Sequence, residues 1–225
     1  MARKQQRRNA NPQRKVLVVD DHPVFRQGLA QLINQQRDLA VCGEAADAAS
    51  ALQLMNSLRP DVAVVDVTLK GSDGIDLVKA LNLRYPGLPV LVLSMHDESV
   101  YAEHALRAGA RGYVMKQEPT EVVLAAIRRV LGGDLYLSES LAARMLQRFF
   151  GTRHNADVSP LGFLSGRELQ VFHLLGEGLG TREIADRLHL GISTVESHRA
   201  GIKLKLKLNS ATELMQHAVR WAQSE

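Results

Sequence analysis

The feature that most constrains this fold is a regular alternation of short apolar runs with longer segments of helical periodicity. The apolar runs are rich in valine and leucine, and they occupy residues 16–19, 39–42, 62–65, 90–93 and 112–115. After each run, apolar residues recur at helical spacing, near residues 24–36, 47–58, 73–84, 97–108 and 120–131. Continuous apolar runs are typical of parallel strands covered on both faces. The alternation therefore predicts an α/β fold with a doubly wound, five-stranded parallel sheet.

The alternation stops near residue 132, and the rest of the chain contains no strand-like run. One helix is expected at 138–150, and four more near 166–177, 181–188, 194–207 and 211–223. A loop containing Gly, Pro, Ser and Asn separates the first of these helices from the other four. The expected organisation is a disordered arm, an α/β domain, a linker with one helix and an all-α domain, over residues 1–15, 16–132, 133–162 and 163–225. A chain of 225 residues with 45% hydrophobic content can bury two modest cores.

The small net charge of +4 is unevenly placed, because residues 1–15 carry six basic side chains and no acidic one. Such a run is usually a solvated arm, and a weak non-specific contact with nucleic acid is the alternative. No apolar run approaches the roughly 20 residues that span a bilayer, and no signal peptide is evident. The single cysteine, Cys42, cannot form an internal disulfide, which fits a reducing compartment. We therefore expect a soluble, cytoplasmic protein.

Polar side chains follow the carboxyl ends of four predicted strands. They are Asp20, Asp21, Asp66, Ser94 and Lys116. Because ligands bind outside the carboxyl ends of strands in an open parallel sheet, we expect these side chains to share one pocket. Three carboxylates at close range repel one another and attract a hard cation, and oxygen ligands suit Mg²⁺. The pattern predicts a Mg²⁺ site at which Asp66 is a carboxylate nucleophile toward a phosphoryl group and Lys116 neutralises that group.

Each of these residues also has a simpler interpretation as a helix cap, a turn residue or a solvated charge. Asp47 and Asp73 begin helical segments, and for them capping is the preferred interpretation. His22 lies near the same edge and is expected to be incidental. A Mg²⁺-dependent phosphatase with an aspartyl nucleophile is an alternative function. Such enzymes usually carry a second acid two residues after the nucleophile, where this chain has Thr68.

In the C-terminal part, two Ser-x-x-Glu segments have the form of a capping box, at residues 165–168 and 193–196. Between them, residues 181–188 form an apolar-faced segment and Gly191 interrupts the chain, which predicts a helix-turn-helix. At about 100° per residue, the third helix places one apolar stripe against the core and a polar stripe opposite. The polar stripe and its flanks could enter a major groove, and they include Glu196, Ser197, Ala200, Arg199, Lys203 and Lys205. An ordinary helical bundle with a solvated face is the alternative, and Glu196 is equally explained as a cap.

Residues 15–131 resemble the response-regulator receiver domains of two-component signalling, which implies a flavodoxin-like fold. The resemblance implies that Asp66 is the phosphoacceptor, beside the acidic pair Asp20 and Asp21. It implies a switch hydroxyl at Ser94 and a switch aromatic at Tyr113, three residues before Lys116. The implied metal ligands are Asp21, Asp66 and the backbone carbonyl of Thr68, with Asp20 acting through water. The chain departs from the family at Lys70, where proline is usual.

Residues 164–221 resemble a LuxR-type helix-turn-helix, chiefly through the segment Thr194-Val195-Glu196-Ser197-His198-Arg199. With a receiver in front, the whole chain resembles the NarL/FixJ class of response regulators. The resemblance implies base contacts by Glu196, Ser197 and Ala200. It implies DNA backbone contacts by Thr181, Arg199, Lys203 and Lys205. Leu204 departs from the family, which often has a basic residue there. The last helix carries Leu214, Ala218 and Trp221, which either pack on the helix-turn-helix or form a dimer contact.

The function implied is that of a DNA-binding transcriptional response regulator, activated when a partner histidine kinase phosphorylates Asp66. Ser94 and Lys116 are expected to move toward the phosphoryl group and Tyr113 to turn inward, freeing the DNA-binding domain to act as a homodimer. No enzymatic activity is expected beyond Mg²⁺-dependent participation in its own phosphorylation and dephosphorylation. A constitutive DNA-binding protein with an inert receiver is the remaining alternative.

Overall fold

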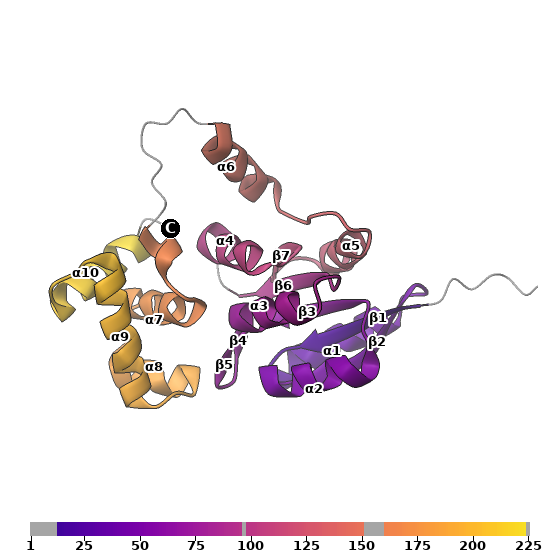
Figure 1. Ribbon diagram of the computed structural model, residues 1–225, viewed down its shortest axis with the longest axis horizontal. Helices are drawn as coiled ribbons and strands as arrows, with labels where there is room; N and C mark the ends of the chain where they lie inside the picture. The colour runs from indigo at the N-terminus through magenta and orange to yellow at the C-terminus, as the bar shows by residue number, and fades with distance from the viewer. Residues whose placement is uncertain (1–12, 96–97, 151–159, 224–225) are drawn as a thin grey trace, which may run out of the picture.

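The computed structural model describes residues 13–95, 98–150 and 160–223 (Figure 1). Most of the predicted basic arm and part of the predicted interdomain loop lie outside these residues. Arg14 and Lys15, which the prediction assigned to the arm, belong to the first strand. In the part of the chain that the structure describes, no helix is both long and apolar enough to cross a membrane.

The central sheet has five parallel strands in the order β2-β1-β3-β6-β7. Their bounds are β1 Arg14–Val19, β2 Leu39–Ala45, β3 Val62–Asp66, β6 Val90–Ser94 and β7 Gly112–Met115. β3 and β6 are buried along their whole length, as their continuous apolar runs predict. The predicted doubly wound α/β fold is confirmed. The strand order changes direction at β1, so a crevice forms at the carboxyl ends of β1 and β3.

Helices cover both faces of the sheet, and two apolar clusters mark the two layers. The helices are α1 Pro23–Asn34, α2 Ala48–Leu58, α3 Gly74–Arg84, α4 Glu98–Ala108 and α5 Thr120–Leu131. The cluster on one face includes α1 and α5, and that on the other includes α2, α3 and α4. Both predicted caps are confirmed, because Asp47 accepts a hydrogen bond from the Ser50 N–H and Asp73 accepts from the Ile75 and Asp76 N–H groups.

A short antiparallel hairpin follows the phosphoacceptor candidate, and the sequence analysis missed it. Its strands are β4 Thr68–Leu69 and β5 Ser72–Asp73, joined through Gly71 at a φ of +68°. Two-residue strands are too short to produce a periodic pattern. The hairpin leads directly into α3, where the Gly74 N–H donates to the Val67 carbonyl at 2.8 Å.

The C-terminal domain is helical, as predicted. After α6 Glu139–Phe150, a 3₁₀ turn at Pro160–Phe163 leads into α7 Gly166–Gly176, α8 Thr181–Leu188, α9 Ile192–Leu206 and α10 Ala211–Ala222. The capping box at Ser165 and Glu168 is confirmed, with both reciprocal hydrogen bonds present. The second predicted capping box is wrong. Because α9 already begins at Ile192 with Gly191 as its N-cap, Ser193 lies inside the first turn.

The last helix packs against its own domain. Leu214 and Ala218 are fully buried, and α10 packs against α7. The Trp221 ring lies 5.5 Å from that of Phe172 and 5.7 Å from that of His173. Leu214 and Ala218 therefore pack on the helix-turn-helix, which was one of the two interpretations of this helix. Because these two side chains fill the core, they offer no surface to a second chain in this arrangement, contrary to the dimer contact expected for them.

The two domains touch each other through α7, which contacts α3, and through the 3₁₀ turn, which contacts α4 (Figure 1). His104 of α4 lies within hydrogen-bonding distance of the Leu161 carbonyl, at 3.2 Å. One apolar cluster continues from the sheet through Tyr101 to Phe172 and Leu175 of α7. The C-terminal domain is thus docked on the α3 and α4 side of the sheet.

Gly74 fixes how closely α3 approaches the end of β3. A Cβ atom at this position would lie 1.8 Å from the Asp66 carbonyl oxygen, which is backbone and cannot turn aside. We expect Gly74→Ala to destabilise the α/β domain by about 3 kcal/mol or more through overpacking. The matched control is Gly28→Ala in α1, where nothing lies within 4 Å and a gain of about 0.5–1 kcal/mol is expected. Urea denaturation followed by circular dichroism measures both, and an equal response of the two variants would contradict the prediction.

Candidate phosphorylation site and DNA interface

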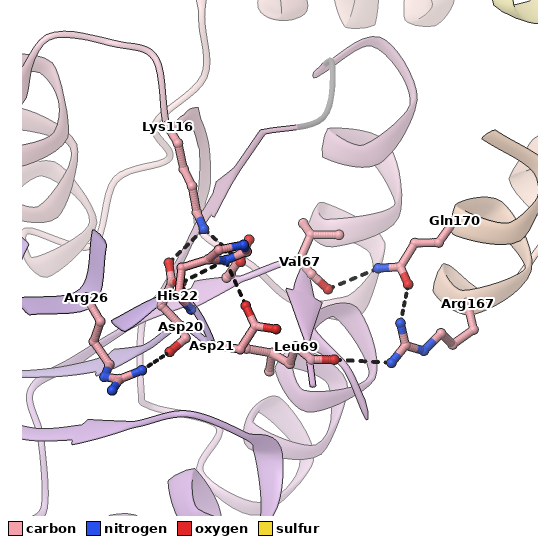
Figure 2. A network of polar contacts seen from close by, with 10 residues as sticks. Asp20, Asp21, His22, Arg26, Val67, Leu69, Lys116, Arg167 and Gln170 are labelled. Carbon is pink, nitrogen blue, oxygen red and sulfur yellow. Dashed lines mark hydrogen bonds and ion pairs between the residues drawn. The ribbon is translucent and has the colours of Figure 1, made fainter. Parts of the chain in front are cut away.

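The carboxyl ends of four strands bring the predicted site residues together. Asp66 and Ser94 end β3 and β6, and Asp20 and Lys116 directly follow β1 and β7. The Lys116 ammonium lies 2.7 Å from Oδ2 of Asp20 and 2.7 Å from Oδ2 of Asp66 (Figure 2). All three of these side chains are only 3% exposed. The pocket predicted from the strand ends therefore exists, with the lysine as a bridge between two buried carboxylates.

The acidic oxygens converge closely enough to share one ion. Ligand atoms of Asp20, Asp21, Asp66 and His22 all lie within 4.8 Å of one another. Three carboxylates face one ammonium, so two negative charges are left for a divalent cation to balance. The donors are mostly hard oxygens, the type that Mg²⁺ prefers. These residues therefore fit a divalent metal ion, although His22 supplies a nitrogen rather than an oxygen.

The sequence analysis gave His22 no role, and the structure places it in this group. Its Nδ1 atom lies 2.8 Å from Oδ1 of Asp21 and 3.6 Å from Oδ1 of Asp20 (Figure 2). Its position directly after the acidic pair was the available signal. Since its side chain is 65% exposed, it lies at the mouth of the pocket.

The pKa of Asp66 is raised to about 6, chiefly by burial and also by repulsion from the neighbouring Asp20 carboxylate. The Lys116 ammonium and a hydrogen bond from the Thr68 backbone N–H act in the opposite direction. The Lys116 ammonium is itself held in place, because it lies 4.6 Å from the centre of the Phe25 ring. Asp66 is thus a carboxyl whose charged form depends on nearby cations.

The two switch residues are both inside the domain. Ser94 is fully buried, and its carbonyl accepts a hydrogen bond from the Lys116 N–H at 2.8 Å. Tyr113 is 1% exposed and belongs to the apolar cluster that includes α4. The expectation that Tyr113 turns inward on phosphorylation does not fit this structure, because the ring is already inside.

The C-terminal domain lines one side of a cavity that includes the acidic pocket. A cavity of about 310 Å³ is bounded by receiver residues that include Asp21, Asp66 and Lys116. Its other walls come from α7 and from the end of α8, through Gln170, Leu174, Arg187, Leu188 and His189. Periodicity within one element carries no information about contact between domains, so this wall could not be found from the sequence. Both domains therefore contribute side chains to the space beside Asp66.

Several predicted DNA-contacting residues have partners within the domain. Glu196 accepts a hydrogen bond from the Thr181 hydroxyl at 2.7 Å and pairs with Arg199, which also donates to Thr181. Lys205 pairs with Glu168 at 2.5 Å. The capping interpretation of Glu196 does not hold, since its carboxylate joins α9 to the start of α8. Ser197 and Ala200 are exposed on α9, and Leu204 is 81% exposed.

A receiver-type sheet with an acidic pocket, joined to a helix-turn-helix, defines a two-domain regulator. Residues 16–128 match the response regulator receiver domain, and residues 163–218 match the bacterial regulatory proteins of the luxR family. The chain belongs to the response regulators that carry a LuxR-type DNA-binding domain. It is a DNA-binding transcriptional response regulator of a two-component system.

Among similar proteins is the oxygen regulatory protein NreC of Staphylococcus haemolyticus, 35% identical over 92% of this chain and 97% of that protein. NreC of Staphylococcus carnosus is 34% identical, again over 92% of this chain and 97% of that protein. RcsB from Salmonella enterica serovar Typhimurium, bound to promoter rprA with the phosphomimetic BeF₃⁻, superimposes with a TM-score of 0.59 at 25% identity, over 92% of this chain and 99% of that one. A LuxR-family response regulator from Aurantimonas has a TM-score of 0.57 at 33% identity, over 61% and 99%.

The raised pKa of Asp66 makes stability depend on pH when divalent cations are absent. The folded protein binds this proton more tightly than the unfolded chain, whose aspartates titrate near 3.8. The stabilisation is therefore fully present below about pH 4 and is lost as the pH rises through about 6. Asp66→Asn has no such proton, so we expect its unfolding free energy to fall less between pH 4 and pH 7, by on the order of 1–3 kcal/mol.

Urea denaturation in EDTA measures this difference. Asp73, whose pKa burial also raises to about 6, is present in both proteins and leaves a common pH dependence. Equal slopes for the wild type and Asp66→Asn would contradict the raised pKa of Asp66.

Proposed function

We propose that Asp66 accepts a phosphoryl group from a partner histidine kinase and that this reaction controls binding of DNA. The observation that supports this most directly is the buried Lys116 ammonium, 2.7 Å from both Asp20 and Asp66. An ionised Asp66 oxygen attacks phosphorus, the bond from phosphorus to the donor histidine nitrogen breaks, and the imidazole leaves with the electron pair. Asp66 becomes an acyl phosphate, and the donor regains a neutral histidine after protonation.

In this proposal Mg²⁺ is held by Asp21, Asp66 and the Thr68 backbone carbonyl, with Asp20 acting through water. When bound, the cation supplies charge neutralisation for the phosphoryl oxygens. Lys116 orients the Asp66 carboxylate before transfer and then pairs with the new phosphoryl group. The Ser94 hydroxyl, at the end of the neighbouring strand β6, supplies a further hydrogen bond. The close approach of the carboxyl oxygens and the excess of two negative charges support this assignment.

The lining of this cavity by both domains suggests how phosphorylation acts on the second domain. A phosphoryl group adds up to two negative charges and three acceptor oxygens to a space of about 310 Å³ that includes α7 and α8 side chains. The docked arrangement is then less favourable, and the DNA-binding domain is released to act as a homodimer on paired half-sites. RcsB, a structural relative, has been observed as dimers bound to DNA.

For the DNA contacts, we propose that α9 enters the major groove. Glu196, Ser197 and Ala200 face base edges, while Thr181, Arg199, Lys203 and Lys205 contact the DNA backbone. The exposed positions of Ser197 and Ala200 on one face of α9 support the first group. Arg199 and Lys205 exchange their acidic partners within the domain for phosphates when DNA binds.

Phosphorylation is tested by comparing the wild type with Asp66→Ala in the presence of Mg²⁺ and a small phosphodonor such as phosphoramidate. We expect the wild type to incorporate phosphate. We also expect the phosphodonor to lower the protein concentration at which the wild type footprints a duplex selected from a random pool. For Asp66→Ala we expect no incorporation and no shift in that concentration. Incorporation without a change in occupancy contradicts the switching mechanism. No incorporation favours the inert receiver, and turnover of free phosphomonoesters favours the phosphatase.

The DNA contacts are tested on the selected duplex by salt titration. Lys203→Ala removes one phosphate contact, so we expect weaker binding on all sequences and a salt slope smaller by about 1. Arg220→Ala is the control, because Arg220 lies on α10 and its side chain bonds the Gln216 carbonyl. An unchanged salt slope for Lys203→Ala would remove this residue from the interface.

A further inference from the structure

The segment of residues 67–69, which includes strand β4, presents its backbone to two different partners. The Val67 carbonyl accepts a hydrogen bond from Nε2 of Gln170 at 3.2 Å, and the Leu69 carbonyl accepts from the Arg167 guanidinium at 3.2 Å (Figure 2). Both donors belong to α7 of the DNA-binding domain. Peptide groups of an extended strand alternate in direction, so the N–H and carbonyl of Thr68 face the opposite side. On that side the Thr68 N–H donates to the Asp66 carboxyl.

The α7 donors are firmly fixed to the hairpin. Arg167 is 7% exposed and Gln170 is 1% exposed. The Arg167 guanidinium bonds Oε1 of Gln170 at 2.6 Å and the Ser72 carbonyl at 2.7 Å, in addition to Leu69. A buried guanidinium is costly unless its donors are satisfied, and here three of its partners hold it in one place. The two side chains and the hairpin therefore form one connected polar unit.

The start of α7 approaches the hairpin most closely at Gly166. A Cβ atom on Gly166 would lie 2.5 Å from Oδ2 of Asp73, and the three nearest atoms all belong to this carboxyl group. Oδ1 of Asp73 caps α3, while Oδ2 lies at the positive end of the α7 dipole. Gly166 thus offers a way to disturb docking without removing either donor.

We propose that Arg167 and Gln170 are positioning residues of the phosphorylation site, which hold the Thr68 carbonyl toward Asp21 and Asp66 from within the DNA-binding domain. This inference rests on the metal site of the proposed function. A two-stranded hairpin is marginally stable by itself, so without α7 the short β4 strand samples other positions. Docking removes this freedom before the cation binds, and preorganisation of a ligand raises affinity. The docked chain therefore binds Mg²⁺ more tightly than the undocked chain, and Mg²⁺ by linkage strengthens docking.

The consequence is an order of events. The unphosphorylated, docked protein is the form prepared to hold the cation, because α7 completes the backbone geometry of the site. Phosphoryl transfer then adds volume and charge to the enclosed pocket and opposes docking. The domain that phosphorylation releases is thus the domain that prepares the site for phosphorylation.

The experiment is a Mg²⁺ titration of the full chain without phosphodonor, followed by the amide NMR signals of the receiver. We expect the double variant Arg167→Ala/Gln170→Ala to raise the Mg²⁺ dissociation constant by on the order of tenfold, as loss of residues that orient metal ligands does. Gly166→Ala, which keeps both donors, is expected to produce a similar rise. Arg220→Ala, an exposed α10 arginine, serves as the control and is expected to leave the constant unchanged.

Emission from Trp221, the single tryptophan, reports docking in the same samples, because its ring lies 5.7 Å from His173, which lies 6.4 Å from Tyr101 of the receiver. A dissociation constant equal to that of the wild type in both the double variant and Gly166→Ala overturns the proposal. A merely structural role lowers the urea midpoint but leaves the constant of the folded protein unchanged. Asp66→Ala separates the two proposals: if wild type and Asp66→Ala bind Mg²⁺ equally, the metal site itself is wrong.

Discussion

The contact between Lys116 and the two carboxylates of Asp20 and Asp66 is the interaction on which the rest of the structure depends. All three groups are almost completely buried at the carboxyl ends of parallel strands. Burying a carboxylate there costs free energy, which an oppositely charged partner offsets. The lysine compensates one charge of three, counting Asp21, and the remaining two negative charges are ones that a divalent cation could balance. The strand order thus brings the three charged groups together, and their burial follows from their position at the strand ends.

The β4–β5 hairpin connects this arrangement to the second domain. It begins directly after Asp66 and Val67, and Gly74 brings its far end back against the end of β3, so the base of the hairpin is tied to the Asp66 backbone. Its carbonyls are bonded by α7, while its Thr68 N–H points into the pocket. Lys70, at the tip, replaces the proline that is usual in the family. A loop without proline has more freedom, which gives the docked α7 a larger part in fixing its conformation.

The sequence was sufficient for those features that depend on local chemistry or on a period within one element. The five strands, the caps at Asp47 and Asp73 and the capping box at Ser165 were all predictable, and so was the convergence of polar residues at the strand ends. The second capping box failed because Gly191 started α9 earlier and Thr181, fifteen residues before Glu196, offered its carboxylate another partner. Contacts between distant segments, such as Arg167 with Leu69, leave no periodic signal in either segment.

The domain interface contains the kinds of group that the proposed switch requires, since the two domains must be able to dock and to separate. Its polar part joins side-chain donors to backbone carbonyls, and water can satisfy both sets of groups after separation, so undocking leaves no buried charge unpaired. Its apolar part, around Tyr101 and Phe172, is continuous with the core of each domain. It contributes a hydrophobic stabilisation that does not depend on orientation. Position is thus set by Arg167, Gln170 and the fit of Gly166 on Asp73. A small displacement of Thr68 misaligns the hydrogen bonds that Arg167 and Gln170 make with the neighbouring carbonyls. Hydrogen bonds weaken steeply with misalignment, whereas apolar contacts tolerate sliding.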